Sequence, residues 1–388
     1  MTQSLQQGPN VGRLWPSEST TFSDVDSATS VRQLTNYRAH SHHFYFTNTG
    51  WHANDTRLLI ASDRGNATNL YSIDLTTGEL LQVTDLAPLA LPREVEFLRA
   101  CVSRTVEEVY FWYGLDLVAL DLTSLETRIL YQMAEGWDVS MINCSADGQF
   151  VYASLSEDLS SQFRVDYLRG YVGFAETWAA KPLSRVLRVA TDGSGSDVLY
   201  EEKYWIGHVN TSPTAGDVLT FCHEGPWAKV DQRIWGLDTT TGRAWKIRAP
   251  QRGEAVGHEY WYADGERDGY HGRNPDGTQF LGHCRYDDTD HVENSFPGQT
   301  GHIHSNGPEL IVGDGGKQVR LWKWTGEAYD GPRLLCRHDS SMKIQQLHVH
   351  PRFSADSSHV VFTSDVTGYG NVYLAQVPDF DALPNIDE

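Results

Sequence analysis

The sequence predicts an all-β protein, a seven-bladed β-propeller in which an N-terminal strand completes the last blade. Three observations lead to this prediction: short β-prone runs separated by turn residues, a unit of about four strands that recurs seven times, and a final unit that is one strand short. Long helical periodicity is scarce, and only the segment 162–177 leaves both a helix and an elaborated loop open.

The repeated unit is clearest near the start of the chain. It reads as a strand at 58–63, a strand at 69–74, a hairpin with the pattern D-x-x-T-G-E, and a strand at 82–84. Variants of this unit recur down the chain, and the least regular one spans 259–285. A unit of about four strands has the size of a propeller blade, so the repeat predicts the architecture.

The last unit explains how the chain is organised into domains. Its strands are expected at 359–365 and 371–375, and the segment 29–35 has the pattern of the missing fourth strand. The sequence therefore predicts one domain over 1–388, with an N-terminal extension at 1–28, a closing strand at 29–35 and blades at 36–380. Two packed sandwiches would explain neither the repeat nor this closure.

Composition and charge exclude several classes of protein and partner. The chain is 40% hydrophobic, with 12 Trp and 18 Tyr, which is ample for a core and excludes disorder. Acidic residues outnumber basic ones by 51 to 31, so no nucleic acid and no anionic membrane surface is expected as a partner. An anionic small substrate would need a local group of cations, either arginine or a metal.

Cysteine usage and the absence of apolar segments predict a location. The five cysteines are widely spaced and form no C-x-x-C, so a disulfide framework or a cysteine metal site is not expected, and a reducing compartment fits. The first residues lack the features of a secretory signal, and no apolar run approaches the length of a membrane span. The sequence predicts a soluble cytoplasmic protein and leaves its oligomeric state open.

A histidine-containing stretch near the C-terminus is the strongest sign of chemistry. Segment 344–353 reads I-Q-Q-L-H-V-H-P-R-F and places His348 and His350 two residues apart in β-prone surroundings. Alternate residues of a strand share a face, so both imidazoles are expected to present nitrogens to one metal ion. Gln345 is expected on the bend that leads into this strand. The alternative is a polar strand face whose histidines only bond to their neighbours.

Two further clusters, at 257–259 and 301–306, suggest that one site is assembled from separate strands. Both lie at the start of a repeated unit, on the strands expected to line the channel of a propeller, where water would also favour polar residues. Other histidines with this placement are expected to line the channel and face the substrate: His42, His208 and His223. Their neighbours Glu224 and Glu259 are candidates for orienting them. Signatures of a serine nucleophile, a P-loop or a dinucleotide site are absent from the sequence.

Several motifs, taken together and in order, resemble the oligogalacturonate lyases over nearly the whole chain. They are F-C-H-E-G-P at 221–226, V-D-Q-R-I-W at 230–235, G-H-E-Y-W at 257–261, G-H-I-H-S-N at 301–306, V-G-D-G at 312–315 and Q-Q-L-H-V-H-P at 345–351. The resemblance implies a cytoplasmic seven-bladed propeller enzyme that cleaves short pectin fragments, especially the disaccharide. The implied reaction is β-elimination to 4,5-unsaturated uronates (5-dehydro-4-deoxy-D-glucuronate), with a divalent metal of the manganese type.

The resemblance also implies roles for individual residues. Gln345, His348 and His350 match the Q-x-x-H-x-H ligand motif, and His302 matches the third histidine ligand. His304 stands where family members carry an apolar residue; it is the alternative ligand and a candidate substrate contact. A ligand set rich in nitrogen intrinsically favours zinc, nickel or copper, so the assignment of manganese rests on the resemblance.

Two residues take the catalytic roles that the resemblance implies. His258 takes the place of the base and Arg233 that of the arginine that neutralises the substrate carboxylate. The chemistry of the reaction agrees with these roles. The C5 proton of a uronate leaves only once the adjacent carboxylate is neutralised. A histidine, whose ordinary pKa is about 6.5, can accept that proton. Taken alone, Arg233 fits an ordinary strand arginine paired with Asp231 better, whereas its motif favours the catalytic role.

Two other functions stay open at this point. One is a lyase or epimerase of the same mechanism that acts on another uronate oligomer. The other is a non-catalytic propeller that serves as a binding module. The sequence does not identify the acid that protonates the leaving group or the preferred length of the oligomer.

Overall fold

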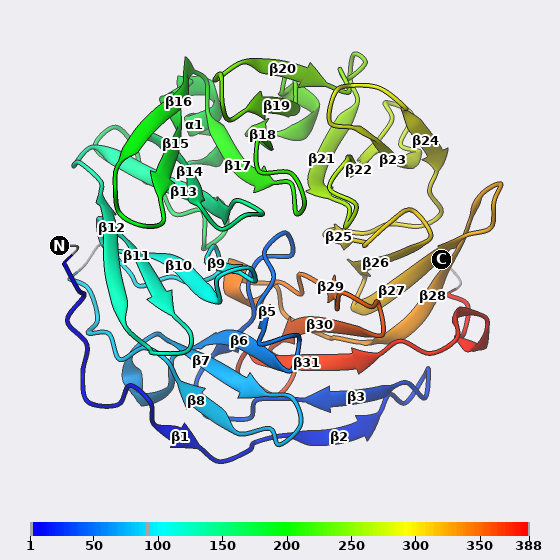
Figure 1. The fold of residues 1–388 in the computed structure, drawn as a ribbon. Helices are drawn as coiled ribbons and strands as arrows, with labels where there is room; N and C mark the ends of the chain where they lie inside the picture. Colours follow the sequence, from blue (N-terminus) through cyan, green and yellow to red (C-terminus); the bar gives the residue numbers. More distant parts are fainter. Residues whose placement is uncertain (1–2, 91–92, 387–388) are drawn as a thin grey trace. The chain divides into compact units, whose positions relative to one another are not determined.

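The computed structural model describes residues 3–90 and 93–386 of the 388. These residues form seven antiparallel sheets and one α-helix, α1 (Phe174–Ala180) (Figure 1). The chain divides into two compact units, one of 1–129, 298–325 and 330–388, the other of 130–297 and 326–329. No helix in the described part of the chain is long and apolar enough to cross a membrane.

Four of the sheets lie mainly in the first unit. One has β1 (Leu14–Trp15), β8 (Leu80–Gln82), β7 (Asn69–Asp74), β6 (Arg57–Ser62), β4 (Ser41–His42) and β5 (Trp51–His52). The next has β12 (Thr127–Gln132), β11 (Asp116–Asp121), β10 (Glu108–Tyr113) and β9 (Cys101–Ser103). Another has β25 (Ile303–His304), β26 (Leu310–Gly315), β27 (Gln318–Trp324) and β28 (Tyr329–Arg337). The last has β2 (Thr20–Ser23), β3 (Ser30–Gln33), β31 (Asn371–Gln376), β30 (His359–Ser364) and β29 (Arg352–Phe353).

The second unit holds the other three sheets, each built from consecutive strands. The first has β13 (Trp137–Cys144), β14 (Phe150–Glu157), β15 (Leu183–Ala190) and β16 (Ser196–Lys203). The second has β17 (Ile206–Thr211), β18 (Val218–His223), β19 (Ile234–Asp238) and β20 (Ala244–Ile247). The third has β21 (Ala255–Trp261), β22 (Arg267–Arg273), β23 (Gln279–Arg285) and β24 (Val292–Ser295). Short 3₁₀ turns complete the described elements: η1 (Arg64–Asn66), η2 (Trp227–Lys229), η3 (Gln345–Leu347) and η4 (Phe380–Ala382).

The N-terminal segment is built into the sheets of the first unit. Strand β3 pairs with β31, with Val31 opposite Ala375 and Gln33 opposite Tyr373, so the predicted strand at 29–35 joins the last sheet. That this pairing closes the propeller stays a prediction, as does the single domain. Within the predicted extension at 1–28, β2 pairs with β3 and β1 pairs with β8. The segment 162–177, left open above, enters the helix only at Phe174.

Apolar side chains between neighbouring sheets hold each unit together. In the first unit, Val31, Val360 and Tyr373 form one cluster with Val312 and Leu321 of the adjacent sheet. Every one of these side chains is at most 2% exposed. Burying one such side chain contributes roughly 1.5–3 kcal/mol, so these clusters explain why the strands are rich in β-branched and aromatic residues.

The first strand of every sheet in the second unit carries a β-bulge of one extra residue. Its register with the second strand shifts between Val139 and Ile142 in β13, between Ile206 and Val209 in β17, and between Gly257 and Tyr260 in β21. In each case one extra residue sits on the first strand, outside the regular ladder. The bulges at 207–208 and 258–259 therefore set the direction of two of the histidines discussed below.

Candidate functional site

Three histidines of the first unit converge on one point. Each of His302, His348 and His350 offers a ring nitrogen, and these nitrogens all lie within 4.8 Å of one another. His302 and His350 are buried and His348 is half-buried. Burial, followed by the neighbouring His302, lowers the pKa of His348 to about 4, so its imidazole is neutral at pH 7. Neutral imidazoles are the form that binds a metal, and three of them fit a divalent transition metal ion.

The backbone that carries two of these histidines differs from the prediction. His348 and His350 were expected on a strand, but β29 begins only at Arg352 and the turn η3 comes before them. His350 adopts a φ of 43°, which no regular strand contains. The predicted strand face is therefore wrong, although both rings still reach the cluster. Gln345 lies half-buried on η3, and its role as the fourth ligand stays a prediction.

A buried carboxylate orients His302. Asp314 Oδ2 lies 2.8 Å from His302 Nδ1, and its Oδ1 accepts hydrogen bonds from the backbone N–H groups of His302 at 2.7 Å and Gly301 at 3.0 Å. Burial acts to raise the pKa of Asp314, but His302 and these hydrogen bonds outweigh it and the pKa lies below its ordinary value. The carboxylate therefore accepts Nδ1–H and leaves Nε2 as the ligand nitrogen. Sequence reasoning quoted the V-G-D-G motif but missed this role.

Replacing Asp314 with asparagine is expected to weaken metal binding by about 10- to 100-fold, because the amide is a weaker acceptor and no longer fixes the ring of His302. Titration of the purified protein with manganese, followed by calorimetry, measures this change without relying on activity. The exposed Asp356→Asn variant is the matched control and should bind as the wild type does. Unchanged affinity in Asp314→Asn would contradict an orienting role.

In the second unit, Arg233 is held between two carboxylates. Its Nε donates to Glu259 at 2.9 Å, its Nη2 to Glu259 at 3.2 Å and its Nη1 to Glu224 at 2.9 Å. Arg233 is 3% exposed and Glu259 is fully buried. The alternative prediction, an ion pair between Arg233 and Asp231, is wrong. The Asp231 carboxylate instead lies 3.0 Å from the ring nitrogen Nδ1 of His223. With one arginine and two glutamates, the network has a formal net charge of −1.

His208 and Cys222 lie against this network. The ring of His208 is 3.7 Å from Glu224 Oε2 and 4.0 Å from Glu259 Oε1. Burial raises the pKa of Cys222 well above its ordinary value, so the thiol is neutral. His208, Cys222 and Glu259 have the spacing of a metal site, but both oxygens of Glu259 hold Arg233, which occupies the place of a cation. Glu224 and Glu259 thus bind Arg233. Their position next to histidines in the sequence had suggested a different role, which was to orient those histidines.

His258 lies on the bulge of β21, half-buried, with a φ of 51°. Its Nδ1 is 3.0 Å from Nε2 of His271 on the neighbouring strand β22. Trp227 packs edge-on against both rings, with centroid distances of 4.7 Å and 5.6 Å. A Cβ on Gly257 would lie 2.3 Å from the Trp227 ring, so a glycine is required there. Sequence reasoning did not single out His271.

The remaining predicted substrate contacts are buried histidines bonded within their own units. His42 Nδ1 is 2.8 Å from the backbone oxygen of His43, and burial lowers the pKa of His42. His223 lies between Asp231 and Glu202, with a ring nitrogen 2.6 Å from Glu202 Oε1. His304 Nδ1 accepts from the N–H of Phe353 at 3.3 Å, and burial lowers the pKa of His304 well below its ordinary value. Their contact with substrate stays a prediction.

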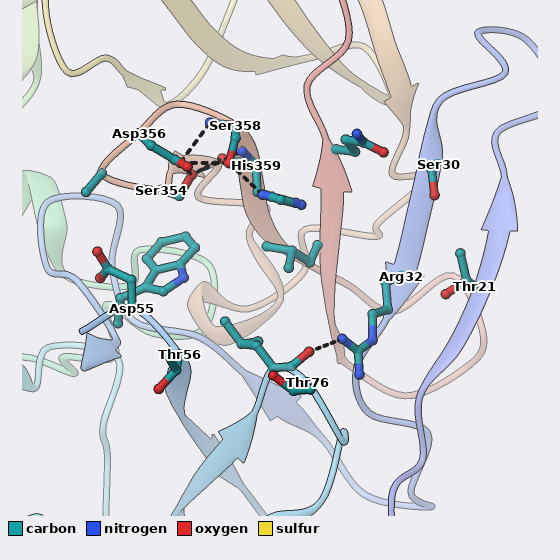
Figure 2. Close-up of a pocket in the computed structure, with 15 residues that line it drawn as sticks. Thr21, Ser30, Arg32, Asp55, Thr56, Thr76, Ser354, Asp356, Ser358 and His359 are labelled. Carbon is teal, nitrogen blue, oxygen red and sulfur yellow. Dashed lines mark hydrogen bonds between the residues drawn. The ribbon is translucent and has the colours of Figure 1, made fainter. Parts of the chain in front are cut away.

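A pocket of about 580 Å³ opens elsewhere in the first unit (Figure 2). Its charged lining residues are Asp55, Asp356, Arg32 and His359, and the Asp356 carboxylate already accepts three hydrogen bonds from Ser354 and Ser358. It lies at the His359 end of β30, about 13 Å along that strand from the end where the histidine cluster is attached. Its carboxylates make it a poor site for an anionic sugar.

The fold and the histidine cluster define a β-propeller with a candidate transition-metal centre, and comparisons identify its family. The family model described as oligogalacturonate lyase matches residues 11–320. The chain belongs to the oligogalacturonate lyase family. The oligogalacturonide lyase of Pectobacterium atrosepticum is 25% identical over 395 residues, covering 92% of this chain and 96% of that protein. The oligogalacturonate lyase of Dickeya dadantii is 25% identical over 391 residues, with the same coverage of 92% and 96%.

A solved structure also matches the chain over most of its length. It is an oligogalacturonate lyase in complex with manganese, with a TM-score of 0.85, 25% identity, and coverage of 95% of this chain and 98% of that chain. The predicted fold class, a seven-bladed β-propeller, is confirmed by this match and by the seven sheets. The prediction of a lyase of this family is confirmed as well.

Proposed function

We propose that this protein cleaves short oligogalacturonides, digalacturonate among them, by metal-dependent β-elimination, and that manganese is its metal. The observation that carries the proposal is the cluster of His302, His348 and His350, with Asp314 orienting the first of them. Related lyases act on oligogalacturonate, and the solved relative contains manganese. The products are then a shortened sugar and a 4,5-unsaturated uronate.

The histidine cluster holds the metal in this proposal. His302, His348 and His350 supply three neutral nitrogens and Gln345 supplies an amide oxygen, so no ligand charge offsets that of the ion. When bound, the metal supplies Lewis-acid stabilisation to the negative charge that develops on the substrate carboxylate. Asp314 keeps His302 in the tautomer that presents Nε2.

In the proposal, His258 is the base that removes the proton from C5 of the uronate. Arg233 takes a smaller share of the neutralising charge than the sequence predicted, because Glu224 and Glu259 already offset it. Its role in the proposal is to hold these carboxylates in place beside His208, and to offer the substrate carboxylate a hydrogen bond.

The test is the ultraviolet absorbance of the conjugated C4–C5 double bond. Purified protein is treated with a chelator, dialysed and mixed with digalacturonate, with and without added manganese. The expected result is a rise in absorbance only when manganese is restored, with the unsaturated uronate identified by mass spectrometry. A flat trace with digalacturonate, trigalacturonate and longer oligomers would overturn the substrate assignment.

The alternatives are separated by the same assay. A panel of other uronate oligosaccharides would give a larger rise than galacturonate oligomers if the enzyme acts on a different uronate. A binding module would give no rise with any of them, while still binding sugar in calorimetry. Turnover that persists without metal, after complete removal of manganese is verified, would overturn the metal dependence.

A further inference from the structure

We propose that His271 is a positioning residue, which fixes the ring nitrogen of His258 that receives the substrate proton. The inference rests on the proposed function, because His271 is inferred to be the partner of His258, the proposed base. It comes from the geometry of β21 and β22, where His258 and His271 form a pair of imidazoles within one unit.

The two rings meet edge to edge. Their planes are inclined by only 13°, their centroids are 5.2 Å apart, and His258 Nδ1 lies 3.0 Å from His271 Nε2. Nearly parallel planes at this centroid distance, with a short contact between two ring nitrogens, correspond to a hydrogen bond close to both ring planes. The two imidazoles are therefore not stacked face to face, an arrangement in which their ring nitrogens could not share a proton.

Such a hydrogen bond holds one proton between the two nitrogens, and its direction decides the chemistry. When His258 donates from Nδ1, its Nε2 carries the lone pair and can act as a base. When His271 donates instead, His258 carries its hydrogen on Nε2 and that nitrogen is not a base. We assign the first arrangement, so His271 accepts at Nε2 and carries its own hydrogen on Nδ1.

The pair also becomes stronger as the reaction proceeds. The C5–H bond breaks, its proton bonds to Nε2 of His258, and the C–H electron pair delocalises into the adjacent carboxylate. That pair forms the C4–C5 double bond as the C4–O bond breaks, and the leaving oxygen keeps the C4–O electron pair and takes a proton from water. His258 is now an imidazolium whose Nδ1–H donates to His271, and a charge-assisted hydrogen bond is stronger than a neutral one.

The surroundings keep the pair in this geometry. His271 is 4% exposed, on a regular strand, whereas His258 sits on the bulge that turns its ring toward β22. The ring of Trp227 stands nearly perpendicular to both imidazoles and lies directly over Gly257. An aromatic wall on one side and a fixed acceptor on the other leave the ring of His258 little freedom to turn over.

Two substitutions of His271 separate positioning from packing. Phenylalanine keeps a planar ring against Trp227 but removes the acceptor, and glutamine places its side-chain oxygen near the position of Nε2, where it can accept. His271→Phe is expected to lower kcat roughly 100-fold with KM little changed, and His271→Gln is expected to restore most of that loss. Thermal unfolding of both variants serves as the check on packing. Equal losses in both variants, or a loss confined to KM, would overturn the inference.

A spectroscopic measurement tests the inference without activity. In protein labelled with ¹⁵N-histidine, the signal of His258 is assigned by its absence in His258→Asn. At a pH where His258 is neutral, we expect the Nδ1–H tautomer in the wild type and in His271→Gln, and a shift toward the Nε2–H tautomer in His271→Phe. An Nε2–H tautomer in the wild type would overturn the inference. The expected tautomers without any turnover would instead refute the proposed function alone.

Discussion

Replacing His258 with asparagine is expected to lower kcat for oligogalacturonide cleavage by about 10²- to 10⁴-fold, because the reaction then has no base at C5. Asparagine suits the position, since His258 has a φ of 51° and asparagine is among the residues that tolerate a positive φ. The site is half-buried and lies in a bulge, so the ladder between β21 and β22 stays intact. Initial rates from the absorbance of the unsaturated product measure the effect.

A matched control exists in another sheet of the same unit. Ser140 is half-buried and occupies the corresponding bulge position of β13, and no catalytic role is proposed for it. Ser140→Ala should leave kcat and the unfolding midpoint unchanged. If His258→Asn or His258→Ala keeps near-normal turnover with an intact fold, His258 is not the base.

Replacing Arg233 with methionine is expected to destabilise the protein by roughly 3–5 kcal/mol, because it leaves two buried carboxylates without their cation. The side chain of Glu259 is fully buried and that of Glu224 is 11% exposed, so water cannot replace the lost hydrogen bonds. Unfolding by urea, followed by tryptophan fluorescence, measures the change. The triple variant in which Glu224 and Glu259 also become glutamine should recover much of the loss, since it removes the unpaired charges.

A surface ion pair of the same unit provides the control for Arg233. Arg185 pairs with Glu201, and the two side chains are 33% and 42% exposed. Arg185→Met should cost about 0–1 kcal/mol, because solvent screens exposed pairs. Equal losses for Arg185→Met and Arg233→Met would contradict the view that the buried network depends on its arginine.

Acid should weaken the same network in the wild type. Burial acts to raise the pKa of Glu224, but Arg233 and His208 outweigh it, so the folded pKa lies below the ordinary value. The stability that Glu224 contributes is therefore present above its unfolded pKa of about 4.3 and is lost as the pH falls through the folded pKa.

Strands and turns could be predicted because their signals are local. In the hairpin that follows β7, Asp74 accepts from the N–H groups of Thr76 and Thr77, both at 2.9 Å, and Asp238 repeats this with Thr240 and Thr241. Side chains that bond their own turn mark it in the sequence. The regular strands between such turns follow from β-prone residues, and they lie close to the predicted positions.

The parts of the site that depend on register could not be predicted in this way. His302 meets Asp314, and His258 meets His271, across neighbouring strands, at distances set by where each hairpin turns. The bulges have no local signature, and His350, whose φ is positive, packs its ring against Tyr45 and His302, which are distant in the sequence. Residue types in the sequence indicated the metal ligands and the base. Their partners, Asp314 and His271, could be identified only once the pairing of the strands was known.

The bulges of β13, β17 and β21 affect how such an enzyme can acquire new side chains during evolution. Because the extra residue lies outside the ladder, a new side chain there alters the chemistry while the hydrogen bonds that hold the sheet stay in place. Two of the three bulges carry histidine, and the third carries Ser140 and Met141. At the third bulge the half-buried Ser140 can therefore be exchanged for another side chain without breaking a hydrogen bond of the ladder.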